Sequence, residues 1–194
     1  MKSQAARIIK AVVYILFISS LLISASARAQ TAQDYLARGE QHLNAGQYRQ
    51  AILVTKKALT LDPKLTTGWR NLALAHFMSN DFKSALDACR QWVELEPRSY
   101  LAWNNLGVAH LKLKQFSNAV EAFRKSLSLE ANAPLVLVNL GEALSGMGKQ
   151  SEAEASFNQA AAQNQGSADF WLALGTARFR LAQYDKASTA FKRA

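Results

Sequence analysis

The sequence contains little cysteine and little proline, and each shortage excludes a class of structure. Among 194 residues there is one Cys, so no internal disulfide can form. Only three Pro and nine Gly are present, and the many Ala and Leu residues favour helices throughout. With 49% hydrophobic and 19% charged residues, the composition is that of a globular chain. We therefore expect an all-α protein held together by packing, with Cys89 buried and inert on a core-facing helical position.

The sequence also lacks an apolar run of the ~20 residues that span a bilayer as a helix. The apolar run at residues 11–25 is shorter than this and follows a short stretch with three basic residues and no acid. Ala27 and Ala29 then stand at the small-residue positions that precede a cleavage site. This pattern predicts an export signal over residues 1–29 and a periplasmic or secreted protein that begins at Gln30. The alternative is an uncleaved membrane anchor formed by residues 11–25.

The net charge of +9 does not indicate a nucleic-acid partner. Residues 1–29 hold four basic residues and no acid, so the other 19 basic and 14 acidic residues leave a net charge of +5. These basic residues are scattered along the chain, whereas a nucleic-acid-binding surface clusters them on one stripe. We therefore expect no nucleic-acid partner, and membrane contact only through the N-terminal segment if it is uncleaved.

One stretch of the sequence recurs at a fixed distance. "NLGVAHLKLKQFSNA" at residues 105–119 aligns with "NLALAHFMSNDFKSA" at 71–85 and with "NLGEALSGMGKQSEA" at 139–153, so both alignments have the same 34-residue offset. From residue 32 the register continues without insertion or deletion, and the repeats are 32–65, 66–99, 100–133, 134–167 and a partial 168–194. In each repeat, apolar residues recur at spacings of three and four in two stretches. This predicts two helices of about 14 residues joined by a short turn.

Three positions keep their character in every repeat. The first helix carries a large residue: Tyr35, Trp69, Trp103, Leu137 and Trp171. Four residues later stands a small one: Gly39, Ala73, Gly107, Gly141 and Gly175. The second helix carries an invariant alanine: Ala51, Ala85, Ala119, Ala153 and Ala187. We expect each small residue to face that alanine, so that the helix axes approach to about 8 Å. Pro134 is expected in the first turn of a helix, where its missing N–H costs no hydrogen bond.

These positions resemble the tetratricopeptide repeat (TPR) family. In the third repeat the residues that match the family motif are Trp103, Leu106, Gly107, Ala119 and Phe123. The resemblance covers residues 32–194 and implies an α–α superhelix, a TPR solenoid of four full and one partial helix-turn-helix repeats. A TPR domain is thus expected over residues 30–194, with a concave groove lined by the first helices. The fourth repeat departs from the family pattern because it lacks Trp and Pro.

Three histidines, His42, His76 and His110, recur at the repeat spacing where the family usually has Tyr. Equivalent residues in stacked helices lie about 8–10 Å apart, whereas Zn²⁺ ligands lie about 2.0–2.1 Å from their ion. We therefore expect polar packing between repeats and neither a metal nor a cofactor. No nucleophile–base pair or Gly-rich phosphate loop is visible, so the sequence does not predict an enzyme.

Asn71, Asn105 and Asn139 occupy one position of successive first helices and would form a ladder with steps of about 9 Å. An amide both donates and accepts hydrogen bonds, so such a ladder can hold the backbone of an extended peptide. The alternative is that the asparagines support contacts between helices. Arg70 and Lys112 at the groove edge could bind a carboxylate. The predicted groove residues are Arg70, Asn71, Leu74, Phe77, Asn104, Asn105, Val108, Lys112, Asn139 and Glu142.

The predicted partner is accordingly a protein or an extended peptide. The function that we expect is that of an exported interaction scaffold which aids assembly of an envelope complex. The alternative is an adaptor region of a longer multidomain protein or enzyme truncated at residue 194, because the sequence stops inside the second helix of its last repeat without a polar capping helix. A third hypothesis, RNA binding through similar helical repeats, is weakened by the export signal and by the scattered charge.

Overall fold

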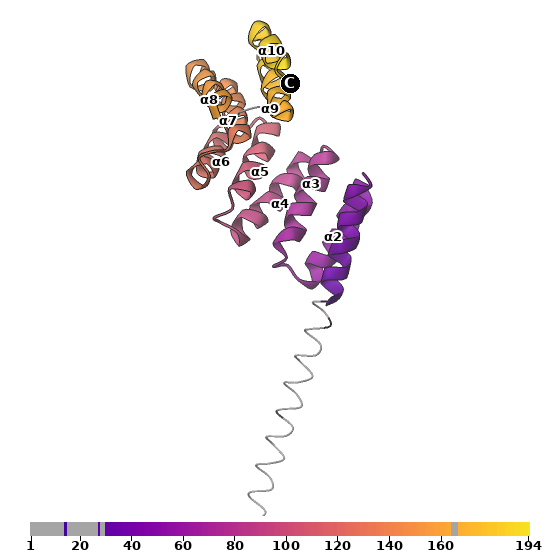
Figure 1. Cartoon of the computed structure of the whole chain (residues 1–194). Coiled ribbons are helices and arrows are strands. Elements are labelled where there is room, and N and C mark those ends of the chain that lie inside the picture. Colours follow the sequence, from indigo (N-terminus) through magenta and orange to yellow (C-terminus); the bar gives the residue numbers. More distant parts are fainter. Residues whose placement is uncertain (1–13, 15–26, 28–29, 164–166) are drawn as a thin grey trace, which may run out of the picture. The chain divides into compact units, whose positions relative to one another are not determined.

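The computed structural model describes residues 14, 27, 30–163 and 167–194, and every regular element in these residues is a helix (Figure 1). The prediction of an all-α fold is therefore confirmed. The predicted export signal, including the apolar run at residues 11–25, lies outside the described residues apart from positions 14 and 27. No helix within the described part of the chain has the length and hydropathy needed to cross a membrane.

The helices alternate between first and second helices of successive repeats. Residues 30–44 are helical and are followed by α2 (Tyr48–Leu61), α3 (Thr66–Met78), α4 (Phe82–Leu95), α5 (Tyr100–Lys112), α6 (Phe116–Leu129), α7 (Pro134–Gly146), α8 (Gln150–Gln163), α9 (Ala168–Arg180) and α10 (Tyr184–Phe191). The first helices α3, α5, α7 and α9 thus begin at a constant interval, which is that of the sequence repeat. Pro134 opens α7, as predicted, where no helix carbonyl needs its missing N–H.

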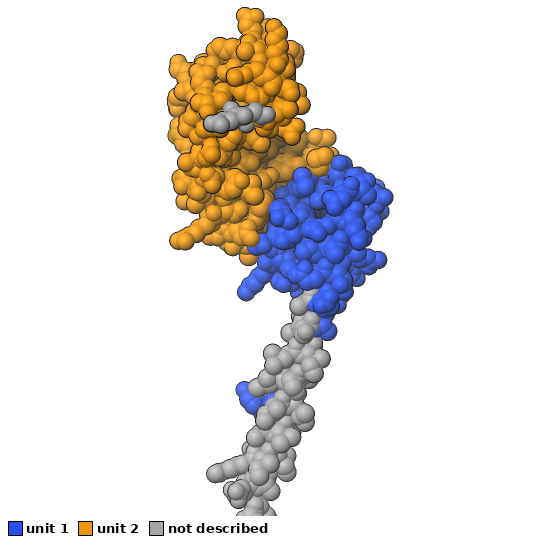
Figure 2. All heavy atoms as spheres, viewed as in Figure 1, with its two compact units in different colours: residues 1–75 blue, residues 76–194 orange. Residues whose placement is uncertain are grey.

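The chain forms two compact units, residues 1–75 and residues 76–194 (Figure 2). The boundary falls inside α3. Unit 1 contains the helix at residues 30–44, α2 and most of α3. Unit 2 contains the end of α3 and α4 to α10.

Within unit 2, the helices from α4 to α8 each pack against the next along the chain, as do α9 and α10, and α7 also packs against both α5 and α9. The first helices therefore stack on one another, as in a solenoid. One continuous core runs from α6 to α10 and includes the buried side chains of Phe123, Phe157 and Leu174. Because one helix pair cannot bury its apolar face alone, each pair is stabilised by the next.

The five turns between first and second helices share one backbone conformation. Each contains a residue in the left-handed region, with φ between 57° and 78°: Gly46, Asn80, Lys114, Gly148 and Ala182. In the third repeat, the N–H of Lys114 donates to the carbonyl of Leu111 and the N–H of Gln115 to the carbonyl of His110, both at 2.9 Å. This pair of bonds is the Schellman motif, which satisfies the last carbonyls of a helix. Glycine, the usual residue at this position, occupies only two of the five turns.

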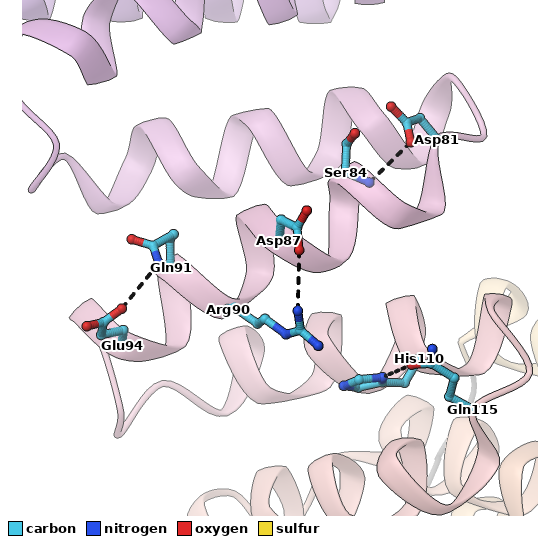
Figure 3. Close-up of polar contacts among 8 residues, drawn as sticks. All are labelled: Asp81, Ser84, Asp87, Arg90, Gln91, Glu94, His110 and Gln115. Atoms are coloured by element: carbon cyan, nitrogen blue, oxygen red, sulfur yellow. Dashed lines mark hydrogen bonds and ion pairs between the residues drawn. The ribbon is translucent and has the colours of Figure 1, made fainter.

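In three of these turns, a histidine near the end of the first helix contacts the residue that precedes the second helix. Nδ1 of His110 lies 2.6 Å from Oε1 of Gln115, which precedes the first residue of α6 (Figure 3). The equivalent contacts join His42 to Gln47 at 2.7 Å and His76 to Asp81 at 3.2 Å. The sequence predicted polar packing between repeats, and packing of that kind stays a prediction. The contacts lie within each repeat, because the left-handed turn brings the residue five positions later back to the end of the first helix.

The small residues of the first helices make room for a side chain on the second helix. A Cβ atom added at Gly107 would stand 2.5 Å from the Phe123 ring, and one at Gly141 would stand 2.5 Å from the Phe157 ring. The sequence predicted an alanine opposite each small residue, yet at the four glycines among them the nearest atoms belong to the residue sixteen positions later. The invariant alanines are buried as well, as Ala119 and Ala153 show. The space that a glycine leaves is therefore filled by an aromatic ring, which gives these repeats their largest fully buried side chains.

Indole groups close the junctions between repeats. Nε1 of Trp103 donates to the carbonyl of Pro97 at 2.9 Å, and Nε1 of Trp69 donates to that of Pro63 at 2.8 Å. In the fourth repeat Leu137 replaces the tryptophan and cannot donate. There, Nε2 of Gln163 on α8 donates instead to the carbonyl of Ala131, the counterpart of Pro97, at 3.1 Å. The same backbone acceptor is thus satisfied by a different side chain.

Cys89 is fully buried in α4, as predicted. Burial disfavours the thiolate and raises the pKa of the Cys89 thiol to about 12. The side chain therefore packs as a small hydrophobic group and stays protonated at neutral pH.

Candidate functional site

A groove of about 390 Å³ crosses the first helices of unit 2 and is called here the first-helix groove. It is lined by Val108, Leu111 and Lys112 of α5, by Val138, Asn139 and Glu142 of α7, and by Asp169, Leu172, Ala173, Thr176 and Arg180 of α9. On α5 and α7 each lining residue stands three or four positions from another lining residue, which places them on one side of each helix. The repeat period then sets these sides next to one another.

Four of the ten predicted groove residues line this groove: Val108, Lys112, Asn139 and Glu142. Asn104 contacts it indirectly through a hydrogen bond to Asn139. Phe77, at the end of α3, is half-buried and is not among the lining residues. Arg70, Asn71 and Leu74 belong to unit 1, and the first-helix groove is built without them. Their role as groove residues stays a prediction.

The three asparagine amides all form hydrogen bonds within the chain. Nδ2 of Asn139 donates to Oδ1 of Asn104 on the neighbouring first helix at 3.1 Å. In unit 1, Nδ2 of Asn71 donates to Oε1 of Glu40 at 3.1 Å, again between first helices. Nδ2 of Asn105 donates to the carbonyl of Leu101 one turn earlier, at 2.8 Å. The bonds of Asn71 and Asn139 are the helix-to-helix contacts that formed the alternative interpretation, and contact with a peptide stays a prediction. An amide carries two N–H donors and an acceptor oxygen, so one such bond does not exhaust it.

The contribution of α9 was not predicted. Leu172, Thr176 and Arg180 line the groove, but the fifth repeat has Ala173 where the asparagine ladder would continue, so the ladder did not indicate this helix. The repeat register contains the missing signal. Arg180 stands two full repeat periods after Lys112, so the two cations occupy equivalent helix ends.

The charged groups of the groove are unevenly distributed. Nη1 of Arg180 lies 3.2 Å from Oε1 of Glu142, which ties α9 to α7. The Glu142 side chain is only 16% exposed, whereas that of Arg180 is 57% exposed. Lys112 is exposed at the end of α5, and Asp169 is exposed in the first turn of α9. Cations therefore gather where the first helices end, and the exposed acid lies where α9 begins.

A second cavity, here called the turn cavity, continues the groove at that cationic end. Its volume is about 650 Å³, and it shares Leu111, Lys112, Glu142 and Arg180 with the groove. Its other lining residues are Phe82, Lys114, Phe116, Ser145, Gly146 and Leu181. Among the described residues, no group of three or more His, Cys, Asp or Glu side chains is placed to hold a metal ion. The two cavities therefore offer apolar, amide and charged contacts along a surface of several helices.

Known proteins share this architecture. Solved structures with similar folds include a MamA protein from Desulfovibrio magneticus RS-1, with a TM-score of 0.69 and 17% identity over 84% of this chain and 92% of that one. YrrB, described as a TPR protein with an unusual peptide-binding site, has a TM-score of 0.61 and 20% identity over 82% of each chain. PilF of Pseudomonas aeruginosa has a TM-score of 0.66 and 21% identity over 86% of this chain and 76% of that one. At these identities the likeness shows the fold alone.

No protein of curated function matches the sequence significantly. Two sequence profiles of the tetratricopeptide repeat do match. One covers residues 100–132, and the other covers residues 36–97 and 138–194, which is more than half of the chain. Together with the stacked helix pairs, the shared turn and the glycine–aromatic contacts, these matches show that the chain belongs to the tetratricopeptide repeat family.

Proposed function

We propose that this protein is an exported interaction scaffold that binds an extended segment of another protein in the first-helix groove and so aids assembly of an envelope complex. The observation that carries the proposal is the groove across α5, α7 and α9, with apolar walls and with amide and charged groups at intervals. Such a mixture suits a peptide, whose side chains contribute apolar area and whose backbone needs hydrogen-bonding partners.

The dimensions of the groove fit an extended chain. Neighbouring helices pack with axes about 8–10 Å apart, so three first helices span roughly 20 Å. An extended segment rises about 3.3 Å per residue, so about six residues would cross the groove. YrrB, a similar fold, is described as having a peptide-binding site, which supports a ligand of this kind.

The export part of the proposal rests on the basic, apolar and small-residue segments of residues 1–29. N-terminal sequencing of the mature protein tests it. A chain that begins at Gln30 supports export with cleavage, and a chain that begins at Met1 in the membrane fraction supports anchoring by residues 11–25. Recovery of the chain beginning at Met1 from the soluble cytoplasm would contradict both.

The groove is tested by placing a charge on its apolar wall. Leu172 is 54% exposed, so Leu172→Glu removes apolar area from the groove without burying a charge. Leu53 on α2 is 52% exposed and lies outside the groove, so Leu53→Glu is a matched control. The measurement is crosslinking in the envelope fraction, followed by identification of the captured proteins by mass. We expect Leu53→Glu to capture the same partner as the unmodified chain and Leu172→Glu to capture none. Equal capture by both variants would place the binding surface elsewhere.

The asparagines require a more selective variant. Changing Asn71, Asn105 and Asn139 together to Ala would also remove two bonds between helices and lower stability. The bond that Asn105 donates goes to a carbonyl of its own helix, so Asn105→Ala leaves those inter-helix bonds intact. Weaker capture at unchanged melting temperature is the result expected if the amide holds a peptide backbone.

The other candidate, a TPR adaptor region of a longer multidomain protein or enzyme, is compatible with the same groove. Reading the open frame beyond residue 194 separates the two. A following catalytic domain would assign the groove to recruitment of that enzyme's partner, and the scaffold role in envelope assembly would then be withdrawn.

A further inference from the structure

The junction between the fourth and fifth repeats contains an ion pair where the preceding junction is apolar. One position of the second helix holds Ile52, Leu86 and Val120 in the first three repeats and Glu154 in the fourth. On the first helix that follows, Arg178 stands where the preceding junction has Leu144. Val120 and Leu144 are 5% and 2% exposed and belong to the continuous apolar core. At this junction, a charged pair has therefore replaced an apolar pair.

The pair is held by contacts from three helices. Nη2 of Arg178 on α9 lies 3.5 Å from Oε1 of Glu154 and 3.3 Å from Oδ1 of Asn158, both on α8. The same Oε1 of Glu154 lies 2.8 Å from Nζ of Lys186 on α10. The Arg178 side chain is 11% exposed and the Glu154 side chain 25% exposed. Three helices thus meet at one carboxylate, and Glu154, Arg178 and Lys186 are here called the junction latch.

The hydrogen bonding of the junction latch is incomplete. Oε2 of Glu154 and Nε of Arg178 are buried and have no hydrogen-bond partner among the described residues. Beside them, a cleft of about 530 Å³ between α8 and α10 has mostly polar lining residues: Gln150, Ser151, Glu154, Ala155, Asn158, Gln183 and Lys186. The attraction within a buried ion pair offsets the lost hydration only where the remaining polar atoms are also satisfied. We therefore expect this junction to open, and to hydrate its charges, more readily than an apolar junction.

Helix α9 connects the junction latch to the first-helix groove. Leu172, Thr176 and Arg180 line the groove, whereas Arg178 points to another side of α9, because residues two positions apart do not share a helix face. On the groove side, Arg180 is tied to Glu142 of α7 at 3.2 Å, and α9 packs against α7. This packing contact can serve as the axis about which α9 tilts when the latch opens. Such a tilt would move the groove residues of α9 relative to those of α5 and α7.

We propose that the junction latch regulates the first-helix groove. While Glu154 and Arg178 are paired, α9 is held where it completes the groove, and when they separate the groove loses its α9 wall. This inference rests on the proposed peptide-binding function and names the regulation of its site. A peptide that contacts α7 and α9 together binds the closed state better, so it favours closure of the latch. By the same coupling, closure strengthens peptide binding.

A purely stabilising role for the ion pair makes a different prediction. A pair that only stabilised the fold would alter the melting temperature when it is removed, without altering the spacing of α8 and α10 or the capture of a partner. The two readouts of the experiment are therefore that spacing and that capture, with the melting temperature measured beside them.

Two variants of the junction separate the open state from the closed state. Glu154→Val leaves the buried guanidinium of Arg178 without its carboxylate, so the junction should open to hydrate it. Adding Arg178→Leu to Glu154→Val recreates the apolar pair of the preceding junction, Val120 and Leu144, and should close it. Arg124→Leu is the control, because it removes a 3.3 Å ion pair between α6 and α8 whose side chains are 60% and 46% exposed.

The spacing is measured by electron paramagnetic resonance between two spin labels on the full chain. The labels are attached to cysteines placed at Ser151 and Asp185, exposed residues in the first turns of α8 and α10. Ser117 and Ser151, at the same positions of α6 and α8, form the control pair. Cys89 is buried and should stay unlabelled. We expect the distance between positions 151 and 185 to be longer and more broadly distributed in Glu154→Val than in the unmodified chain, and narrowest in the double variant. The control pair should not change.

Capture is measured by crosslinking in the envelope fraction. It should fall about tenfold with Glu154→Val, as expected if the groove is complete in about a tenth of the molecules, and recover in the double variant. Arg124→Leu should capture as the unmodified chain does. An unchanged spacing in both junction variants, or a changed spacing with unchanged capture, would overturn the regulation and leave the proposed function standing. Absence of capture by every chain, the unmodified one included, would overturn the proposed function and the regulation with it.

Discussion

At the scale of single residues, each of the five turns between first and second helices needs one residue in the left-handed region, and glycine occupies this position in only two of them. Ala182 has φ of 57°, a conformation in which an L side chain costs about 1–2 kcal/mol and glycine costs almost nothing. Ala182→Gly should therefore raise the free energy of unfolding by about 0.5–1 kcal/mol, after the extra entropy of glycine in the unfolded chain is included. Urea denaturation measures the change.

The opposite substitution can be made at Gly148, which occupies the same position of its turn as Ala182. Its φ is 78° and a Cβ atom added there would meet nothing within 4 Å, so Gly148→Ala tests backbone strain without any clash. It should lower the free energy of unfolding by about 1 kcal/mol. If both substitutions shifted stability in the same direction, the left-handed turn would not be the cause.

The contact between Gly107 and the Phe123 ring should be sensitive to a single substitution. Gly107→Ala would place a methyl group 2.5 Å from the buried Phe123 ring and should destabilise the fold by about 1–3 kcal/mol. The second repeat already combines Ala73 with the smaller Cys89 at the equivalent positions. Adding Phe123→Cys to Gly107→Ala should therefore cost less than the sum of the two single substitutions, by thermal or urea unfolding. Strict additivity would mean that the two side chains do not compete for space.

Asp81 is the N-cap of α4, and the stability that it contributes depends on pH. Hydrogen bonds from the Ser84 hydroxyl and the Ser84 N–H, the latter at 3.1 Å, lower the pKa of Asp81 from its usual 3.8, with a smaller contribution from His76 (Figure 3). Because the pKa is lower in the folded chain than in the unfolded chain, the stabilisation is present above about pH 4 and is lost as the pH falls through the folded value. Asp81→Ala should cost about 1 kcal/mol at about pH 5 and less at about pH 3.

The third repeat provides the control for this prediction. Gln115 stands at the position equivalent to Asp81 and carries no ionisable group. The cost of Gln115→Ala should therefore be the same at about pH 5 and at about pH 3. A cost for Asp81→Ala that also stayed constant would show that the carboxylate charge is irrelevant to the cap.

At the scale of elements, the helices differ in how well they are buried. α10 has 8 residues, whereas α6 and α8 have 14 each. Phe191 of α10 is 40% exposed, although Phe123 and Phe157 at the equivalent positions are 0% exposed. Local opening requires less free energy where fewer apolar contacts are broken. Hydrogen exchange followed by mass spectrometry should show the amides of α10 exchanging at least about tenfold faster than those of α6. Equal protection of the two helices would indicate that they open in one cooperative event.

The elements could be predicted from the sequence because their signals are local and periodic. Apolar spacing identified the helices, and Pro134 marked the start of α7. The predicted partner of Gly107 was Ala119 and the observed one is Phe123, because the choice between them depends on how far the second helix rotates about its own axis. That rotation is set by the packing of whole side chains, which spacing does not reveal. The histidine contacts were missed for a similar reason, since they depend on a turn that glycine marks in only two repeats.

At the scale of the whole molecule, the candidate site was predicted only in part. The repeat register places Val108, Lys112, Asn139 and Glu142 along one groove, because it determines which positions share a face. It does not determine the rotamer of an amide, so the sequence could not decide between a peptide contact and the bond from Asn139 to Asn104. Arg180 was not predicted either, because it follows Ala173 and not an asparagine, although it stands at the repeat position of Lys112. A site that combines several repeats is best sought by listing every residue at an equivalent position, whatever its type.

The junction at Ala131 has a wider consequence. Its carbonyl is satisfied by Gln163, while the equivalent carbonyls of Pro63 and Pro97 are satisfied by tryptophans. The acceptor at this junction is a main-chain carbonyl and is present whatever the side chains are, whereas its donor can come from the first or the second helix of the repeat that follows it. The junction therefore tolerates the loss of the tryptophan that is typical of the repeat.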